Sequence, residues 1–352
     1  MSAESKLRCR GAKPLCARFA WPALAAWAIA GAAVAQEAPP PKPGTVAMLA
    51  QAYGEQFVPR AAAFAQESAR LVDAVDALCN GPAEKGTDGL NAAQAQWRRT
   101  ATAWDRFSGV AVGPLVKRRA LTALDFNPTR PATIERAIQS GPTGPEQMER
   151  IGTPAKGIPA LEWLLWSARP APQTPACRYT QQVAQELARE AVTLKLGFDT
   201  QARTAWDSDA RATFLALQEL INQWLGGVER LRWTQMDKPL KAAENGSRSK
   251  APAFPRAASG HTGESWAANW DALAALGSPV GGALRARGQG ELAARVDESV
   301  RKAGQAMAGA RPDDTTTLAP AVQALGALKK LIEAEVAPAL DVTIGFSDGD
   351  GD

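Results

Sequence analysis

The sequence predicts an all-α protein with two helical bundles packed together. Apolar residues recur at helical spacing in several long segments, and no segment shows the sustained alternation typical of a strand. Clusters of proline and glycine separate the helical segments, as in antiparallel bundles with connecting loops. We expect the structured region to span 45–342, with one bundle at about 45–205 and a second at about 206–342.

The first 35 residues have the features of a secretory signal peptide. A basic head ends at Arg18, an alanine-rich apolar run follows, and the run closes on Ala33-Val34-Ala35. The run is too short and too rich in alanine to be a good membrane span. We therefore expect cleavage after Ala35, no stable membrane span afterwards, and a periplasmic or secreted protein. The alternative is a retained N-terminal anchor.

The net charge of +4 lies entirely in this leader. The leader contains five basic residues and one acidic residue, so the rest of the chain has equal numbers of each. A near-neutral chain argues against nucleic acid or an anionic membrane as the main partner. We interpret the basic stretch 238–256 as a solvated connector.

Two cysteines remain after the leader, Cys79 and Cys177. An even pair in an oxidising compartment predicts a disulfide. Such a bond would close a loop of about 100 residues and stabilise the fold by up to ~4–5 kcal/mol in the chain-entropy model. The alternative is two buried free thiols, because cysteine often packs as a small apolar residue.

Two heptad seams predict the first bundle. After a proline-rich tether at 36–44, large apolar side chains recur every seven residues, and Pro59 marks a kink or a restart of the helix. A second segment repeats the pattern beyond glycine and proline residues at 81–86. The seam residues are Phe57, Phe64, Leu71 and Leu78, then Leu90, Trp97 and Trp104.

The connection 109–156 differs from the two helical segments before it, because its prolines exclude a long helix. A short helix is predicted at 132–138. Thr153 and Pro154 are expected to begin the next helix as its N-cap and first-turn residues. A connection this long and irregular inside a compact domain is often functional.

Five further helical segments complete the prediction, and a polar loop at 237–260 divides them. The acidic, glycine-rich end at 343–352 is expected to be a tail. The helical segments lie around 183–198, 214–231, 266–276, 292–307 and 318–340.

Glu162 is the one charged residue in the stretch GIPALEWLLW, 157–166. If the stretch is a helix, every side chain one turn away from Glu162 is apolar. A carboxylate there needs water or a partner from elsewhere in the fold. It is either a core-edge glutamate paired with a basic residue such as Arg130, or a ligand-binding carboxylate that faces a cleft between the bundles.

The single histidine, His261, restricts the chemistry. A zinc site of the H-E-x-x-H type needs two histidines one helical turn apart, so the sequence excludes it. A hydrolytic triad would depend on His261 alone. The surrounding sequence favours a surface histidine beside a helix that Ser259 or Thr262 caps.

The stretch around Glu162 resembles the motif of the imelysin family, in which a glycine is followed two positions later by a histidine and three further on by a glutamate. Gly157 and Glu162 match this motif, whereas Pro159 stands at the histidine position. Other blocks are similar too, so the resemblance covers nearly the whole chain after the leader. They are WRRTATAWDRFSGVAVGPL (97–115), LDFNPTR (124–130), CRYTQQVAQELA (177–188), LRWTQMDKPL (231–240), SGHTGESW (259–266) and VTIGFSDGDGD (342–352).

The resemblance implies an exported all-α protein with two helical bundles and a site near their interface. It implies that the site binds a metal ion or a small ligand, with iron or another divalent metal as the candidate cofactor and a link to iron uptake. Other envelope proteins are candidate partners. The family was first described as metallopeptidases, but a proline offers no side-chain ligand. We therefore expect ligand binding without peptidase activity.

No catalytic residue is assigned. One alternative is a metallopeptidase that uses Glu162 as general base or metal ligand. Another is a structural or interaction protein in which Glu162 forms a buried salt bridge. The candidate ligand-binding residues are Glu162, which is also the candidate metal ligand, and Gly157, Asp125, Arg130, Ser259 and His261.

Overall fold

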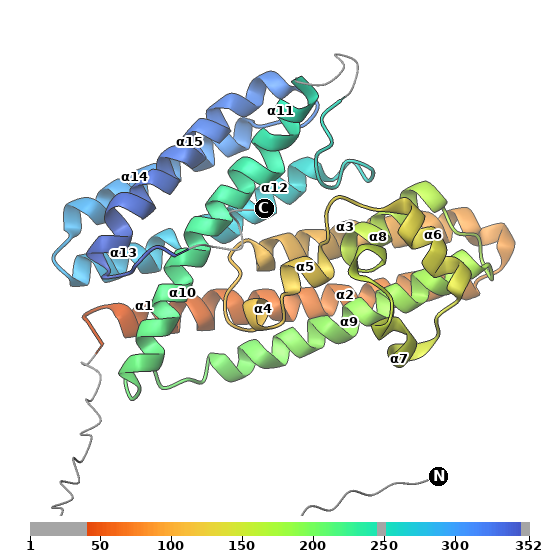
Figure 1. The fold of residues 1–352 in the computed structure, drawn as a ribbon, viewed down its shortest axis with the longest axis horizontal. Helices are drawn as coiled ribbons and strands as arrows, with labels where there is room; N and C mark the ends of the chain where they lie inside the picture. Colours follow the sequence, from red (N-terminus) through yellow and green to blue (C-terminus); the bar gives the residue numbers. More distant parts are fainter. Residues whose placement is uncertain (1–40, 245–250, 346–352) are drawn as a thin grey trace, which may run out of the picture. The chain divides into compact units, whose positions relative to one another are not determined.

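The computed structural model describes residues 41–244 and 251–345. The expected signal peptide, most of the proline-rich tether and most of the acidic tail lie outside the described residues. Within the described ranges every regular element is a helix, apart from one isolated bridge between Arg311 and Asp314 (Figure 1). The all-α prediction is therefore confirmed. No helix in these ranges is long and apolar enough to cross a membrane.

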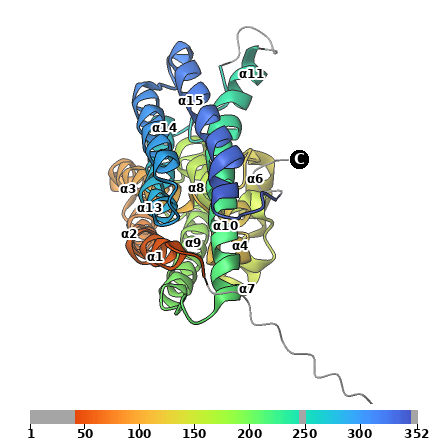
Figure 2. The ribbon, with the colours of Figure 1, turned by 90° about the vertical axis from the view of Figure 1, so that its left-hand side faces the viewer.

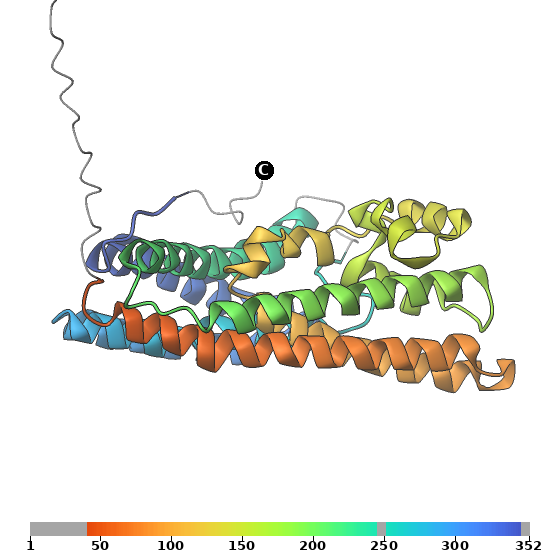
Figure 3. The same ribbon diagram turned by 90° about the horizontal axis from the view of Figure 1, so that it is seen from below.

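Three long helices form the first bundle. Helix α2 (Val58–Asn80) packs along both α3 (Gly86–Ser108) and α9 (Pro175–Gln201), and Figure 3 shows α2 and α9 side by side. All residues of the two predicted heptad seams are buried, as bundle packing requires. Pro59 lies in the first turn of α2, directly after a π-helical segment, η1 (Ala52–Phe57). The backbone stays helical from α1 (Thr45–Gln51) through η1 into α2, so the helix neither ends nor restarts at Pro59, and the π-helical segment before it accommodates the missing N–H.

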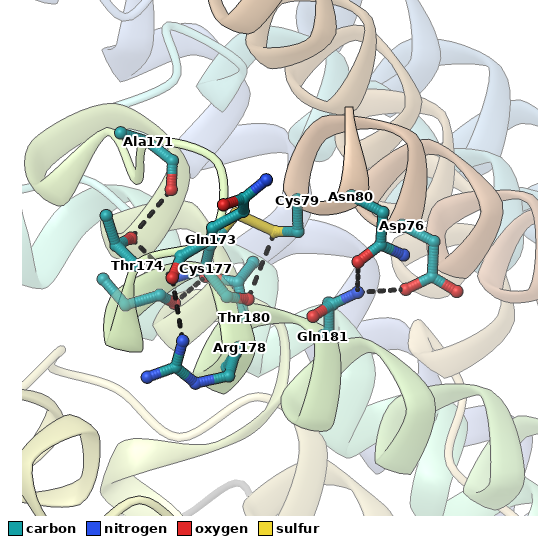
Figure 4. Close-up of a disulfide and its surroundings, with 11 residues drawn as sticks. Asp76, Cys79, Asn80, Ala171, Gln173, Thr174, Cys177, Arg178, Thr180 and Gln181 are labelled. Carbon is teal, nitrogen blue, oxygen red and sulfur yellow. Dashed lines mark hydrogen bonds between the residues drawn. A yellow bond between two sulfur atoms is a disulfide. The ribbon is translucent and has the colours of Figure 1, made fainter. Parts of the chain in front are cut away.

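A disulfide joins Cys79 at the end of α2 to Cys177 at the start of α9 (Figure 4). The predicted pairing is confirmed, and the two Cα atoms lie 5.4 Å apart. Beside the disulfide, the Gln181 amide donates to the Asp76 carboxylate over 2.7 Å. The bond spans 98 positions of sequence, so the chain-entropy model gives a stabilisation of ~4–5 kcal/mol.

The irregular connection after α3 forms short helices, most of which pack on α9. The predicted helix at 132–138 is confirmed. The predicted cap at Thr153 is wrong: Thr153 begins a separate 3-10 turn, η3 (Thr153–Ala155). Gly157 has a left-handed backbone with φ of 76°, so the 3-10 turn does not continue directly into the helix that begins at Gly157. The helices are α4 (Pro114–Lys117), α5 (Ala120–Leu124), α6 (Pro131–Ser140), α7 (Gly144–Glu149) and α8 (Gly157–Trp163), which continues into π-helical η4 (Leu164–Ala168).

The second bundle contains the helices after α9. Helix α10 (Ala210–Glu229) packs on α15 (Leu318–Leu331), and α14 (Gly290–Gly309) packs on both α15 and α13 (Gly277–Ala286) (Figure 2). The sequence did not predict α13, because its glycines and proline hide the apolar period. The short segments of this bundle are π-helical η5 (Arg230–Asp237), α11 (Lys238–Glu244), the 3-10 turn η6 (Thr315–Thr317), π-helical η7 (Ile332–Val336) and α16 (Ala337–Ala339). In the first bundle, the 3-10 turn η2 (Ala83–Lys85) connects α2 to α3.

Two helices connect the bundles within the compact unit Ala38–Asp352. Helix α1 (Thr45–Gln51) belongs to the first bundle by sequence but packs on α10 and α13 of the second. Helix α12 (Thr262–Ala274) packs along α3 of the first bundle. The second contact brings the loop before α12, with Ser259 and His261, to the side of α3.

Candidate functional site

Glu162 anchors the loop that precedes α12. The residue is only 6% exposed, and its Oε1 accepts two hydrogen bonds from Ser259. The Ser259 backbone N–H donates over 2.9 Å and its hydroxyl over 2.6 Å. Arg98 of α3 holds the same loop by donating to the Ser259 carbonyl over 2.9 Å. Two side chains of the first bundle therefore fix the loop at one residue.

Gly157 acts through its backbone. A Cβ at this position would lie 2.3 Å from the carbonyl oxygen of Leu124, and the φ of 76° disfavours any other L-residue. The glycine lets α8 begin directly against the end of α5. It thereby sets the position of Glu162, which lies on the next turn of α8.

Arg256 is the cation of a buried charge cluster. Its Nη1 and Nη2 donate to the two carboxylate oxygens of Asp125 over 2.8 and 2.7 Å, and Nη2 also donates to Asp105 over 3.1 Å. Trp104 donates to Asp125 from its Nε1 over 2.9 Å. Burial raises the pKa of Asp105 above its usual range. For Asp125, burial is the largest single effect and acts in the same direction, but the contacts with Arg256, Trp104 and Asn127 together outweigh it and lower the pKa.

The structure corrects two interpretations of basic residues. Arg130 does not meet Glu162, because it is exposed and its guanidinium stacks over the Phe126 ring at 5.2 Å. The stretch 238–256 is not a solvated connector throughout, because Arg256 is only 3% exposed. The available signal was the pair Asp105 and Asp125: two carboxylates among large apolar residues require a buried cation. The sequence alone did not identify which residue supplies it.

His261 is buried, so the prediction of a surface histidine is wrong. It is 6% exposed, and its Nε2 lies 2.8 Å from the hydroxyl of Thr102 on α3. The predicted caps are also wrong: the Ser259 hydroxyl bonds to Glu162, and the Thr262 hydroxyl donates to the Pro255 carbonyl. These hydroxyls hold the loop in place rather than capping α12.

The environment of His261 favours its neutral form. Burial lowers the pKa of the imidazole, Arg256 and Arg98 act in the same direction, and Glu264 opposes them. The Thr102 hydroxyl, which also donates to the Arg98 carbonyl over 3.0 Å, is hydrogen-bonded to Nε2. The Nδ1 atom lies on the side of Glu264, 3.7 Å from its carboxylate.

A cleft of about 520 Å³ lies between the first bundle and the start of α12. Residues of α2 and α3 form most of its wall, and His261 comes from the second bundle. Glu162 does not line the cleft but fixes the loop that carries His261. The polar residues that the sequence did not single out here are Arg60, Glu67, Arg98, Arg99, Thr102 and Arg106.

The residues near Glu162 do not fit a resident metal ion. Its Oε1 is occupied by two donors from Ser259. Both oxygens of Asp125 are held by Arg256, which also bonds to Asp105, so a guanidinium supplies the positive charge. Among the residues in 41–244 and 251–345, no three His, Cys, Asp or Glu side chains are grouped to hold a metal ion.

Comparisons with known proteins identify the family and the fold. The imelysin family model matches residues 57–338. An imelysin-like protein from Psychrobacter arcticum 273-4 has a TM-score of 0.72 and 20% identity, over 86% of this chain and 97% of that one. A putative iron-regulated protein A precursor from Parabacteroides distasonis ATCC 8503 has a TM-score of 0.62 and 16% identity, over 86% and 98% of the two chains. No significant match is found among curated proteins.

Proposed function

This chain belongs to the imelysin family, and we propose that it is an exported binding protein that holds a small ligand in the cleft beside His261 and has no peptidase activity. The cleft carries the proposal, because it combines about 520 Å³ of space with convergent polar groups from both bundles. Glu162 supports the site indirectly, through the loop that it fixes.

The geometry around Glu162 gives no support to peptide hydrolysis. A general base must reach the proton that it removes, but Oε1 already accepts two hydrogen bonds from Ser259. Pro159 stands where the family motif has a histidine, and the single histidine has its Nε2 against Thr102. The buried carboxylate of Asp105 and the half-buried carboxylate of Asp125 are paired with Arg256. These contacts suit a positioning role better than a hydrolytic one.

Two observations support export and a link to iron. The disulfide between Cys79 and Cys177 is typical of an oxidising compartment, which agrees with the signal-peptide features of residues 1–35. The solved neighbour from Parabacteroides distasonis is described as an iron-regulated protein precursor. We therefore propose a periplasmic or secreted location and a role in iron uptake for this chain as well.

A variant that fills the cleft tests the binding proposal. Ala63 is an exposed residue of α2 that lines the cleft, so Ala63→Trp would occupy the space and leave the helix intact. Wild type and variant are purified from a bacterial periplasm, and the small molecules released on denaturation are identified by mass spectrometry. We expect a molecule that is retained by the wild type and lost from the variant. Equal content in the two proteins would overturn the proposal.

A peptide-cleavage assay tests the absence of hydrolysis. The wild-type protein is incubated with a peptide library, with and without added Zn²⁺ and Fe²⁺, and we expect no metal-dependent cleavage. Cleavage that appears with metal and disappears in Glu162→Gln would establish the peptidase alternative instead.

A further inference from the structure

We infer that the ligand of this cleft is a small organic polyanion that carries two or more carboxylate or phosphate groups. The inference rests on the proposed function and names the chemistry of its ligand. Four arginines, Arg60, Arg98, Arg99 and Arg106, line one cleft with room for a small molecule. Arginine is suited to such a ligand because its planar fork of donors matches carboxylate and phosphate oxygens.

The one carboxylate in the cleft wall does not cancel this charge. Glu67 is already bonded through both oxygens, with Arg70 at 2.7 Å from Oε1 and the Gln96 amide at 2.7 Å from Oε2. Arg70 does not line the cleft, so Glu67 is neutralised by a cation from outside it. Arg106 is likewise paired with Asp271, which does not line the cleft. Arg60, Arg98 and Arg99 therefore leave the cleft with an excess of positive charge.

Arg60 is the arginine most in need of a partner. Its Nη1 is buried and, among the described residues, has no hydrogen-bond partner, and its Nη2 makes one long contact of 3.4 Å with the Asp271 carbonyl. Burial and the charge of Arg106 lower its pKa to about 10, although Asp271 opposes them. A partly desolvated guanidinium without a partner is unfavourable. An oxyanion in the cleft would give the Arg60 guanidinium a counter-charge and offset the repulsion from Arg106.

The other three arginines form hydrogen bonds within the protein through only some of their N–H donors. Arg99 donates from Nε to the Gln96 side chain over 2.8 Å, and Arg106 donates from Nη2 to Asp271 over 2.9 Å. Arg98 donates from Nη2 to the Ser259 carbonyl and stacks over Trp166 at 5.1 Å. Each guanidinium carries five N–H donors, so these contacts orient the groups and leave donors for a ligand.

The shape of the site adds to the charge argument. The wall also contains the apolar side chains of Pro59, Ala63 and Ala103. A ligand with two spaced anionic groups on a carbon frame would contact both kinds of surface. An isolated inorganic ion would meet only part of the site.

Calorimetric titration with citrate and with pyrophosphate tests the inference and separates carboxylate from phosphate chemistry. We expect at least one of them to bind wild type with a dissociation constant below about 1 mM at low salt, and more weakly as ionic strength rises. Spermidine is the control of opposite charge and should not bind. Failure of both anions to bind, or binding unaffected by salt, would overturn the inference.

A pair of variants at Ala63 isolates the charge from the volume of the side chain. A63E places a carboxylate among the arginines, whereas A63Q adds a neutral group of the same size. We expect the anion to bind at least about tenfold more weakly to A63E than to A63Q. Arg136→Ala, an exposed arginine of α6 outside the cleft, should bind as wild type does. Equal affinities of A63E and A63Q for the anion would refute the inference that the ligand is a polyanion.

The Ala63→Trp variant distinguishes this inference from the proposed function. If the tryptophan displaces a retained ligand but A63E and A63Q bind that ligand equally, the cleft binds a ligand that is not a polyanion. If the tryptophan displaces nothing, the proposed function fails together with the inference.

Discussion

The Glu162 carboxylate and the Ser259 N–H and hydroxyl form a buried pair between residues 97 positions apart in the sequence. The pair joins α8 of the first bundle to the loop that carries Arg256 and His261. Arg256 then neutralises the buried carboxylates, and His261 lines the cleft. One contact therefore positions both the buried charge cluster and part of the cleft wall.

A double-mutant cycle measures this pair. Glu162→Ala leaves the buried Ser259 N–H without its acceptor, whereas the Ser259 hydroxyl still has the Arg256 carbonyl within reach, so we expect a loss of roughly 1–3 kcal/mol in the free energy of unfolding. Ser259→Ala removes only the hydroxyl and should cost about 1 kcal/mol. The coupling energy, measured by urea unfolding of the single and double variants, should be about 1 kcal/mol or more. Strictly additive losses would show that the two side chains do not act together.

Gly157→Ala should destabilise the protein by roughly 2–4 kcal/mol, because a Cβ would meet the Leu124 carbonyl oxygen and the backbone is left-handed. The matched control is Gly282→Ala, since Gly282 lies inside α13 with open space around a Cβ. That change should stabilise α13 by up to about 1 kcal/mol. Thermal unfolding of both variants checks the contrast. Equal effects would mean that Gly157 is not required by its geometry.

The helical fold was predictable because it depends on local sequence period. Phe64, Leu71 and Leu78 mark the buried face of α2 by spacing alone, and all are buried. The site was only partly predictable, because its partners come from distant segments. Glu162, Ser259 and His261 could be proposed as neighbours from a family resemblance, but neither periodicity nor composition indicates which of many arginines fills a buried position. Arg256 was therefore missed, although Asp105 and Asp125 indicated that a cation was needed.

Arg256→Met should destabilise the protein by up to roughly 3–5 kcal/mol near pH 7, because buried Asp105 and half-buried Asp125 lose the guanidinium that bonds to both. Arg230 remains as a nearby cation, but its Nη2 is taken up by the Ser108 and Gly109 carbonyls. Without Arg256 the folded-state pKa of both carboxyls would rise above the unfolded value of about 3.9. The unfolded state would then bind fewer protons than the folded state, so the penalty should shrink as the pH falls toward about 4. Urea unfolding at both pH values measures this change.

The control for Arg256 is an exposed ion pair. Arg285 lies 3.2 Å from Asp297 on the surface of the second bundle, and both side chains are about half exposed. Arg285→Met should cost less than about 1 kcal/mol at either pH. A loss for Arg256→Met that is as small as this, or that does not change with pH, would contradict the buried-cluster explanation.

His261 should make folding stability depend on pH in a window just below neutrality. Burial lowers its folded-state pKa below the unfolded value of about 6.5, so the unfolded state binds more protons within that window. Stability is then complete above about pH 6.5 and is lost as the pH falls through the folded pKa. Because the chain has a single histidine, one imidazole resonance in a proton NMR titration reports this pKa directly.

The variant His261→Gln keeps a donor for Thr102 but removes the titrating group. Its midpoint of urea unfolding should therefore change less than that of wild type between about pH 7 and pH 5.5. An NMR pKa at or above about 6.5 in the folded protein, or the same pH dependence in the variant, would mean that burial of His261 does not disfavour its charged form. A polyanion in the cleft should raise this pKa, because negative charge beside the imidazole stabilises the imidazolium. Repeating the titration with the bound anion thus reports on the cleft and the histidine in one measurement.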